Sequence, residues 1–232
     1  MNSVEFDGFA DEYYQNHRAN IAVTGENPEY FAEYKIAVLS RLVSEMNLLS
    51  PRMLDFGSGI GNSIPYVNRL LPGSELTCAD VSQRSLEISE SRFPGLARSL
   101  LIEGERIPAA DDAYDVTFSA CVFHHIPHEE HVHWLSELLR VTRPGGVIMV
   151  FEHNPLNPLT VRAVNTCPFD ANARLIRAGN FLESYRKAGW RQAKVRYHVF
   201  FPRALSMLRR WEPHLSPVAL GAQYSVIATK PG

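Results

Sequence analysis

Around residue 55 the chain reads Met53-Leu54-Asp55-Phe56-Gly57-Ser58-Gly59-Ile60-Gly61-Asn62. An apolar run ends there at an acidic residue and then passes through three glycines into a segment that favours a helix. Glycine is needed where a backbone turns tightly or lets a ligand approach without a Cβ in the way. In an open parallel sheet, that place is the carboxyl end of a strand. The pattern therefore predicts a strand, a loop and a helix that together hold a cofactor.

The glycine spacing separates two classes of cofactor. A dinucleotide site needs G-x-G-x-x-G, whereas this loop has G-x-G-x-G, with Asn62 in the place of the last glycine. The Asp55 carboxylate beside the loop favours a cationic ligand over a pyrophosphate, which a helix N-terminus binds by itself. The loop therefore predicts a positively charged cofactor.

With its D-x-G-x-G-x-G pattern, the loop resembles motif I of the class I S-adenosylmethionine-dependent methyltransferases, type 11-like enzymes that act on small molecules and sugars. Two later segments resemble the same family in the same order, Tyr114-Asp115-Val116-Thr117-Phe118-Ser119 and Arg143-Pro144-Gly145-Gly146-Val147-Ile148-Met149-Val150. The resemblance is specific over residues 53–152. It implies an α/β fold: a Rossmann-like, doubly wound, seven-stranded, mostly parallel sheet with an antiparallel last strand and an N-terminal helical lid.

Hydrophobic spacing predicts the remaining organisation. A helical cap is expected over residues 1–50, with one helix in Phe6–Tyr14 and a second from Glu29, and an S-adenosylmethionine-binding domain over residues 51–232, as a single structural unit. Strands are expected over 75–80, 99–103, 115–119, 195–201 and 223–229, and helices over 64–71 and 181–188. Ser82 is the expected N-cap of the next helix.

The resemblance and the spacing together predict the cofactor site. Asp80 ends a predicted strand about twenty residues beyond the loop, where a carboxylate binds ribose hydroxyls, and Val81 offers an apolar face to adenine. Glu105 lies in a segment two residues shorter than the family's G-D-A-x-x-L-P, so either its carboxyl or only backbone contacts the adenine amino group. In the family's lids a basic residue approaches the methionine carboxylate, a role that falls to Lys35. The expected cofactor-binding residues are Lys35, Asp55, Gly57, Ser58, Gly59, Gly61, Asp80, Val81, Glu105 and Ser119.

Five histidines between Val122 and His133 suggest a metal site, but their spacing argues against one. His128-Glu129-Glu130-His131 is not H-E-x-x-H, so no metal is expected, and most histidines of this helix should be solvated. His124 and His125 stand at the carboxyl edge of the sheet. The resemblance implies that this pair faces the substrate, with His125 as the base; the alternative is a structural role in capping a turn. Tyr13 of the lid is the third expected catalytic residue.

The segment from Glu152 to Pro168 contains two Asn-Pro pairs, which cannot continue a strand. The chain must leave the sheet and cross its edge on the acceptor side. His153, Asn154 and Arg162 are therefore the expected substrate-binding residues, with Asn165 and Cys167 nearby.

Composition narrows the partners. The chain has 232 residues, a net charge of −2 and no run of like charge, so nucleic acid is not expected. No apolar run approaches the roughly 20 residues of a membrane span, and the N-terminus does not resemble a signal peptide, so a cytoplasmic protein without a membrane partner is expected. Its three cysteines are too far apart for a disulfide framework or an iron–sulfur site. The oligomeric state is not indicated.

We therefore expect a methyltransferase that uses S-adenosylmethionine to methylate an oxygen or nitrogen atom of a small polar metabolite, with a sugar or sugar nucleotide as the first hypothesis. C- or O-methylation of an aromatic or quinone-type precursor is the alternative within the family. An NAD-dependent oxidoreductase would need G-x-G-x-x-G and a pair such as Y-x-x-x-K, which the chain lacks. A cofactor-binding protein without catalysis remains open.

Overall fold

The computed structural model describes residues 25–167 and 170–232. Seven strands form one sheet in the order β3-β2-β1-β4-β5-β7-β6. β1 runs parallel to β2 and β4, and β7 runs antiparallel to both β5 and β6. The predicted fold class is thus confirmed. The strands are β1 (Arg52–Phe56), β2 (Glu75–Asp80), β3 (Arg98–Leu101), β4 (Tyr114–Ala120), β5 (Thr142–His153), β6 (Arg191–His198) and β7 (Gln223–Thr229).

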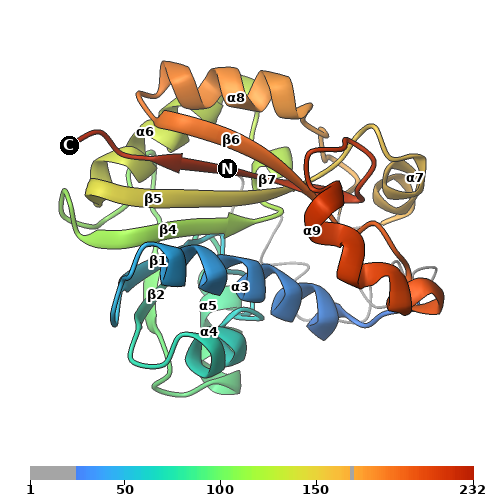
Figure 1. Cartoon of the computed structure of the whole chain (residues 1–232). Helices are drawn as coiled ribbons and strands as arrows, with labels where there is room; N and C mark the ends of the chain where they lie inside the picture. Colours follow the sequence, from blue (N-terminus) through green and yellow to red (C-terminus); the bar gives the residue numbers. More distant parts are fainter. Residues whose placement is uncertain (1–24, 168–169) are drawn as a thin grey trace.

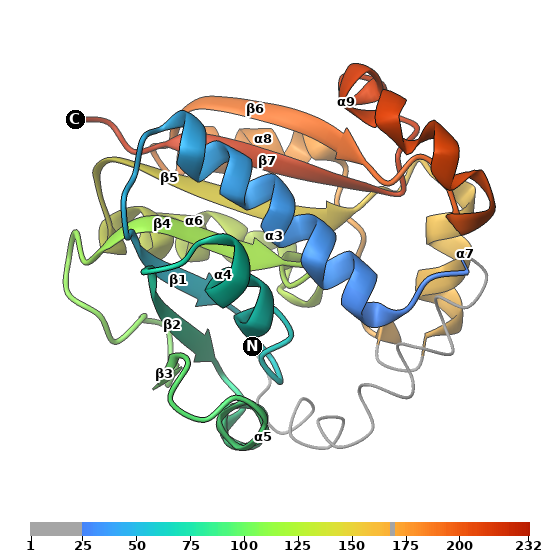
Figure 2. The same ribbon diagram turned by 60° about the horizontal axis from the view of Figure 1, so that its bottom comes forward.

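Helices cover both faces of the sheet (Figure 1, Figure 2). α3 and α4 pack on one face, with one core cluster, and α6 and α8 pack on the other, with a second cluster. The helices are α3 (Pro28–Glu45), α4 (Ile64–Leu70), α5 (Gln83–Arg92), α6 (His131–Val141), α7 (Pro158–Thr166), α8 (Ala178–Lys187) and α9 (Glu212–Leu215), with 3₁₀ segments η2 (Phe123–His125), η3 (His128–Glu130) and η5 (Arg203–Trp211).

The central strands are apolar because both of their faces are covered. Val147, Ile148, Met149, Val150 and Phe151 of β5 are all buried, and so are the apolar residues of β1. Such continuous apolar runs are typical of strands that helices cover on both sides. The carboxyl ends of β1, β2, β4 and β5 consequently meet at one edge, where their following loops lie close together.

α3 is the part of the predicted cap that the structure describes. The side chain of Asn27 caps its start by accepting a hydrogen bond from the Tyr30 amide at 2.9 Å. Ile36, Leu39 and Val43 are buried against the sheet. The helix expected in residues 6–14, and with it Tyr13, lies outside the described residues. The division of the chain at residue 50 stays a prediction.

Three local expectations are refined by the structure. Ser82 caps α5, since its hydroxyl accepts a hydrogen bond from the Ser85 amide at 3.0 Å. β6 spans Arg191–His198 rather than 195–201, because Val199 has a φ of 60° and turns the chain out of the sheet. His131 was expected in solvent but is buried, where its Nε2 contacts the carbonyls of Phe123 and Ile126.

The two Asn-Pro pairs end β5 as expected. β5 stops at His153, and α7 begins at Pro158. Asn157 caps this helix, since its side-chain oxygen accepts hydrogen bonds from the amides of Leu159 and Thr160 at 3.0 and 3.1 Å. α7 itself was not predicted. It carries the chain beyond the carboxyl edge of the sheet (Figure 1).

Candidate functional site

Two adjoining cavities lie at the carboxyl edge of the sheet, against α3. The first has a volume of about 150 Å³ and the second about 260 Å³. Five residues line both cavities: Phe31, Lys35, Ala120, Cys121 and His125. A ligand in one cavity would therefore lie directly beside a ligand in the other.

The three glycines of the loop after β1 have different roles. A Cβ on Gly57 would come within 2.5 Å of the Val122 side chain, and a Cβ on Gly61 would overlap the hydroxyl of Ser89 on α5. A Cβ on Gly59 would meet nothing within 4 Å, and this residue lines the first cavity with a φ of 52°. Gly57 and Gly61 are thus required for packing, whereas Gly59 leaves space open beside the backbone.

Two buried carboxylates face the first cavity. Asp80, at the end of β2, accepts hydrogen bonds from the amides of Gly59 at 2.7 Å and Ser82 at 2.9 Å. Asp55, on β1, accepts a hydrogen bond from the Ser63 hydroxyl. Burial, together with the nearby charge of Asp80, raises the pKa of Asp55 to about 7. The cavity thus presents two acids to a cation or to a pair of hydroxyls.

Seven of the ten expected cofactor-binding residues line the first cavity: Lys35, Asp55, Gly57, Ser58, Gly59, Asp80 and Val81. The other three lie elsewhere. Gly61 packs against α5. Ser119 is buried and donates a hydrogen bond to the Phe56 carbonyl at 2.8 Å, which joins β4 to β1. Glu105 is exposed, and its carbonyl oxygen lies 2.6 Å from His133 Nε2, so its side chain does not reach the cavity wall.

The second cavity changes character along its length. Its inner part adjoins the first cavity and is polar, with His124, His125, His153 and Asp170. Its outer part is mostly apolar: Leu159 is 65% exposed there, and Pro202 is exposed as well. The apolar residues along this wall include Tyr30, Phe31, Leu159, Val164, Phe200, Phe201 and Pro202.

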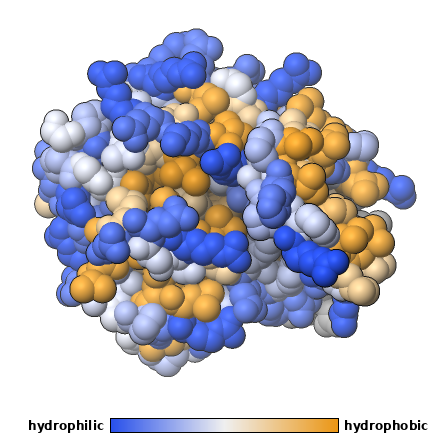
Figure 3. Space-filling model, viewed as in Figure 1, coloured by the Kyte–Doolittle hydropathy of each residue, from blue (hydrophilic) through white to orange (hydrophobic). Residues whose placement is uncertain are grey.

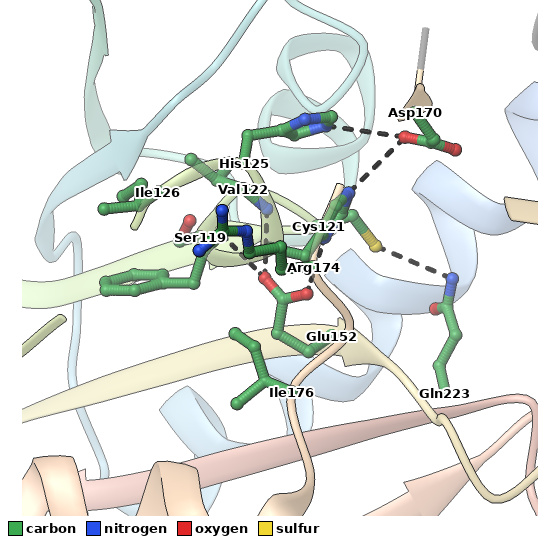
Figure 4. A network of polar contacts seen from close by, with 12 residues as sticks. Ser119, Cys121, Val122, His125, Ile126, Glu152, Asp170, Arg174, Ile176 and Gln223 are labelled. Carbon is green, nitrogen blue, oxygen red and sulfur yellow. Dashed lines mark hydrogen bonds and ion pairs between the residues drawn. The ribbon is translucent and has the colours of Figure 1, made fainter. Parts of the chain in front are cut away.

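A buried network fixes the inner end of the second cavity (Figure 4). Glu152, at the end of β5, accepts hydrogen bonds from the amides of Val122 at 3.1 Å and Phe123 at 2.8 Å. Its other oxygen lies 2.7 Å from Nδ1 of His124. Nε2 of His124 lies 3.5 Å from a carboxylate oxygen of Asp170. Burial opposes the charged form of His124, but the two carboxylates overcome it and raise its pKa to about 10.

His125 is neutral, in contrast to the charged His124. Its side chain lines both cavities, and Nε2 lies 3.5 Å from Asp170. Burial, together with the positive charge of His124, lowers the pKa of His125 to about 3. The rings of His124 and His125 lie with their centroids 4.2 Å apart and their planes inclined by 44°, so the charged imidazole helps to keep its neighbour neutral. His125 is therefore a neutral hydrogen-bonding group at the junction of the cavities.

Cys121 is a polar junction residue that the sequence did not single out. Its sulfur accepts from Lys35 Nζ at 3.3 Å, and Gln223 Nε2 lies 3.7 Å away. Burial alone would raise the pKa of this thiol, but Lys35 and His153 hold it at about 7. Cys121 follows β4 with a φ of 61°. The position of Cys121 after a buried strand and shortly before two histidines could have identified it as a site residue from the sequence.

The expected substrate-binding residues separate in space. His153 lines the second cavity, and so does Cys167. Asn154 is buried and structural, because its amide donates to the Gly221 carbonyl at 2.8 Å. Arg162 and Asn165 are exposed on α7 and line neither cavity. The sequence predicted that this segment crosses the edge of the sheet, but not which of its residues face the cavity. Successive residues of a helix point in different directions, so only some of them can line it.

Two acids of the network, Glu152 and Asp170, were also missed. Glu152 follows five consecutive apolar residues in β5, and a lone acid at the end of such a strand was a usable signal, because a buried carboxylate needs a partner. Asp170 reaches the site from a loop beyond α7. Nothing in its sequence surroundings indicated that position.

Three ligand-type atoms of this network lie close enough to hold a cation. In the part of the chain that the structure describes, Nε2 of His124, Nε2 of His125 and a carboxylate oxygen of Asp170 are within 4.8 Å of one another. These three residues do not include His128 or His131, whose spacing was the reason for expecting no metal. A cation would have to displace the proton that two carboxylates hold on His124, so the expectation of no metal stays a prediction.

Comparison with known proteins gives a consistent family. Residues 54–150 match the family described as a methyltransferase domain. Phthiotriol/phenolphthiotriol dimycocerosates methyltransferase 1 of Mycobacterium ulcerans is 27% identical over 126 residues, 53% of this chain and 45% of that protein. A ubiquinone/menaquinone biosynthesis C-methyltransferase of Ectopseudomonas mendocina is 28% identical over 138 residues, 56% of this chain and 53% of that protein. The chain thus spans about half the length of these curated relatives.

Solved structures share the fold over the whole chain. A methyltransferase of Thermotoga maritima, described as a possible histamine N-methyltransferase, has a TM-score of 0.64 at 20% identity and covers 98% of this chain and 99% of its own. Phosphoethanolamine N-methyltransferase 2 of Haemonchus contortus, in complex with S-adenosyl-L-methionine, has a TM-score of 0.66 at 15% identity, with 98% of this chain and 60% of its own covered. At such identities the likeness concerns the fold.

The expectation that the chain binds no metal can be tested directly. We expect titration of the chain with Zn²⁺ or Mn²⁺ at neutral pH to show no one-to-one binding by calorimetry, because the protonated imidazole of His124 has no lone pair free for a metal. One equivalent of bound metal that disappears in Asp170→Ala, but not in His128→Ala, would overturn this prediction.

The charged state of His124 predicts how stability depends on pH. Its pKa in the folded protein, about 10, exceeds the value of about 6.5 for an unfolded histidine. The stabilisation is therefore complete below about pH 6.5 and is lost as pH rises through 10. Relative to His124→Asn, whose amide still donates to Glu152 but cannot titrate, the parent should lose more than about 1 kcal/mol of unfolding free energy between about pH 6 and pH 9.

Denaturant titrations at each pH measure this difference. Parallel curves for the parent and His124→Asn across the range would show that His124 is not held in its charged form.

Proposed function

The chain belongs to the class I S-adenosylmethionine-dependent methyltransferases, and on that premise we propose that it methylates an oxygen or nitrogen atom of a small acceptor. A polar metabolite such as a sugar or sugar nucleotide is the first acceptor to test. One observation carries the proposal: two cavities meet at Lys35, Cys121 and His125, so a donor and an acceptor can react without water between them.

The first cavity fits S-adenosylmethionine, the cofactor of this family. Asp80 would bind the ribose hydroxyls, Asp55 would lie near the positive charge, and Val81 would contact the adenine. Gly59 leaves the space for the ligand's close approach to the backbone. Lys35 would bind the methionine carboxylate. The cofactor supplies a methyl group on a positively charged sulfur, and holding the acceptor in line with it can be worth about 7 to 11 kcal/mol.

His125 would bind the acceptor, and His124 would position His125. Neutral His125 lines both cavities and can accept a hydrogen bond from an acceptor hydroxyl, but its pKa of about 3 makes it a weak proton acceptor, so its larger contribution would be to orient the hydroxyl. His124 stays protonated between Glu152 and Asp170, so its role would be to orient the neighbouring ring. Tyr13 remains a further candidate from the lid. His153 also lines the acceptor cavity and would contact the substrate, whereas the positions of Asn154 and Arg162 do not favour their predicted substrate contacts.

The wall of the second cavity also favours a second candidate acceptor. Tyr30, Phe31, Phe200 and Phe201 line it, and aromatic rings pack well on one another. One relative of this chain is a ubiquinone/menaquinone biosynthesis C-methyltransferase. An aromatic or quinone-type precursor, methylated on carbon or oxygen, is therefore the alternative.

We further propose that the reaction takes place in the cytoplasm, without nucleic acid as substrate. Within residues 25–167 and 170–232, no helix is both long and apolar enough to cross a bilayer. The chain has a net charge of −2 and no long run of basic residues of the kind that is typical of proteins that bind a phosphate backbone.

Cofactor binding should depend on pH through Asp55. Its pKa of about 7 in the ligand-free protein means that it becomes ionised as pH rises through neutrality, and the ionised form attracts a cation. Calorimetric titration should therefore show tighter binding of S-adenosylmethionine at about pH 8 than at about pH 6. Asp55→Asn should remove this dependence.

Asp80→Ala tests the proposed ribose contact, because it should lower the affinity for S-adenosylmethionine. It removes two charge-assisted hydrogen bonds to ribose, each worth about 1.5 to 3 kcal/mol, so binding should weaken by about 10²-fold or more. If Asp80→Ala binds as tightly as the parent, the cofactor does not occupy the first cavity. NAD serves as the competing ligand, and preferential NAD binding would favour an oxidoreductase instead.

His125→Ala should separate catalysis from cofactor binding. With a hydroxyl acceptor, loss of the ring that accepts its hydrogen bond should reduce turnover by roughly 10²-fold through poorer orientation, with little change in cofactor affinity. An amine acceptor should show a smaller loss, because it needs no prior deprotonation. The parent's turnover should show no step between about pH 5 and pH 9 from His125, whose pKa is near 3.

The assay is release of S-adenosylhomocysteine with a panel of nucleotide sugars, amines, phenols and quinone precursors. His128→Ala is the control, since His128 is exposed and lines neither cavity. If His125→Ala and His128→Ala lost turnover equally, the role of His125 would be structural. If only aromatic acceptors were methylated, the sugar hypothesis would be excluded.

A further inference from the structure

Exposed apolar side chains gather on one side of the molecule. Ten large apolar residues are exposed in the described part of the chain. Eight of them come from two segments, residues 156–159 and residues 205–220. We refer to these eight as the apolar rim: Leu156, Leu159, Leu205, Met207, Leu208, Trp211, Val218 and Leu220. Single exposed apolar residues are normal, but a group of this kind marks an interaction surface.

The two segments are held together by hydrogen bonds. The Asn157 amide donates to the carbonyl of Leu220 at 2.9 Å, and the Thr160 hydroxyl donates to the carbonyl of Ala222 at 2.9 Å. α7 and α9 consequently lie at the same end of the molecule, beyond the carboxyl edge of the sheet, in both ribbon views (Figure 1, Figure 2). Figure 3 shows apolar residues on this right-hand side, separated by hydrophilic ones, as well as over the centre of the face.

The charges within the rim are of one sign. Arg203 and Arg210 are exposed between its apolar residues, and Arg162 is exposed on α7. The only acid between residues 202 and 222 is Glu212, which is 6% exposed and accepts hydrogen bonds from the amides of Phe200 and Phe201. The whole chain carries a net charge of −2, so this basic surface does not simply reflect the composition.

The rim surrounds the outer end of the second cavity. Leu159 belongs to both, and Phe201 and Pro202 line the cavity immediately before η5. Arg209 of η5 also lines it, with its guanidinium over the Tyr30 ring at 4.5 Å and paired with Glu26 at 2.6 Å. Apart from this ion pair, the path from the surface to His125 is mostly apolar at its mouth, and it is polar at its inner end. Such a path suits a molecule with a polar head and a hydrocarbon tail.

We propose that the apolar rim lies on an anionic lipid surface and that the second cavity takes an acceptor with a hydrocarbon chain from it, with the polar head at His125. Apolar side chains with a tryptophan, interspersed with arginines and free of exposed acids, are the features of a segment that lies in the interface of a bilayer. Docking of this kind needs no membrane-spanning helix. The identity of the acceptor rests on the proposed function, but the lipid contact does not.

Vesicle co-sedimentation of the full chain tests the contact. The parent should bind phosphatidylcholine vesicles that contain phosphatidylglycerol, and bind them less well without it or at high salt. Met207→Glu combined with Trp211→Glu should weaken binding by about tenfold or more. Arg203→Gln combined with Arg210→Gln should remove most of the preference for the anionic lipid.

The matched control is Leu49→Glu combined with Leu96→Glu, because within residues 25–167 and 170–232 these are the two exposed large apolar residues outside the rim. It should bind vesicles as the parent does. An equal loss in this control, no binding by the parent, or a dimer in light scattering that Met207→Glu dissociates would each overturn the proposal, the last by showing that a second copy covers the rim.

Calorimetry with S-adenosylmethionine keeps the two proposals distinguishable. The Met207→Glu, Trp211→Glu variant should bind the cofactor as tightly as the parent, since neither residue lines the first cavity. Vesicle binding without cofactor binding would contradict the proposed function alone. Cofactor binding without vesicle binding would contradict the lipid contact alone.

Discussion

The site depends on one buried carboxylate. Glu152 is fully buried, and a charge in that position is stable only when it is paired and hydrogen-bonded. It accepts hydrogen bonds from two amides of the turn after β4 and from the ring of His124 (Figure 4). These contacts hold both the turn and the His124 ring. The next residue, His125, is consequently placed between the two cavities.

Charge is distributed differently in the two cavities. The first has Asp55 and Asp80, whose carboxylates suit a cationic ligand with ribose hydroxyls. The second has a protonated His124 between the carboxylates of Glu152 and Asp170, and burial together with the charge of this imidazole keeps His125 neutral. A neutral acceptor is therefore better matched than an anion to the inner end of this cavity, because burying a further charge there would need a further partner.

The apolar rim widens the range of acceptors that the molecule favours. A polar metabolite would use only the inner end of the second cavity, whereas an acceptor with a hydrocarbon chain would also contact the wall formed by Phe200, Phe201 and Leu159. The two acceptor types share the polar head at His125. They differ in whether the remainder of the molecule lies in water or in lipid.

Local sequence patterns predicted most strands and helices, the glycine loop and the acid at Asp80, because strand, turn and helix preferences act over a few neighbouring residues, and the resemblance of three motifs to a known family implied the sheet topology. The same patterns placed His124 and His125 at the edge of the sheet. Only the tertiary structure decided which side chains meet there: it brought Glu152, Asp170 and Cys121 to the junction, and it left Glu105, Ser119 and Arg162 outside the cavities. It also gathered the rim from two segments about fifty residues apart. Burial and exposure arise from packing between distant segments, and periodicity along the chain does not encode which of those segments meet.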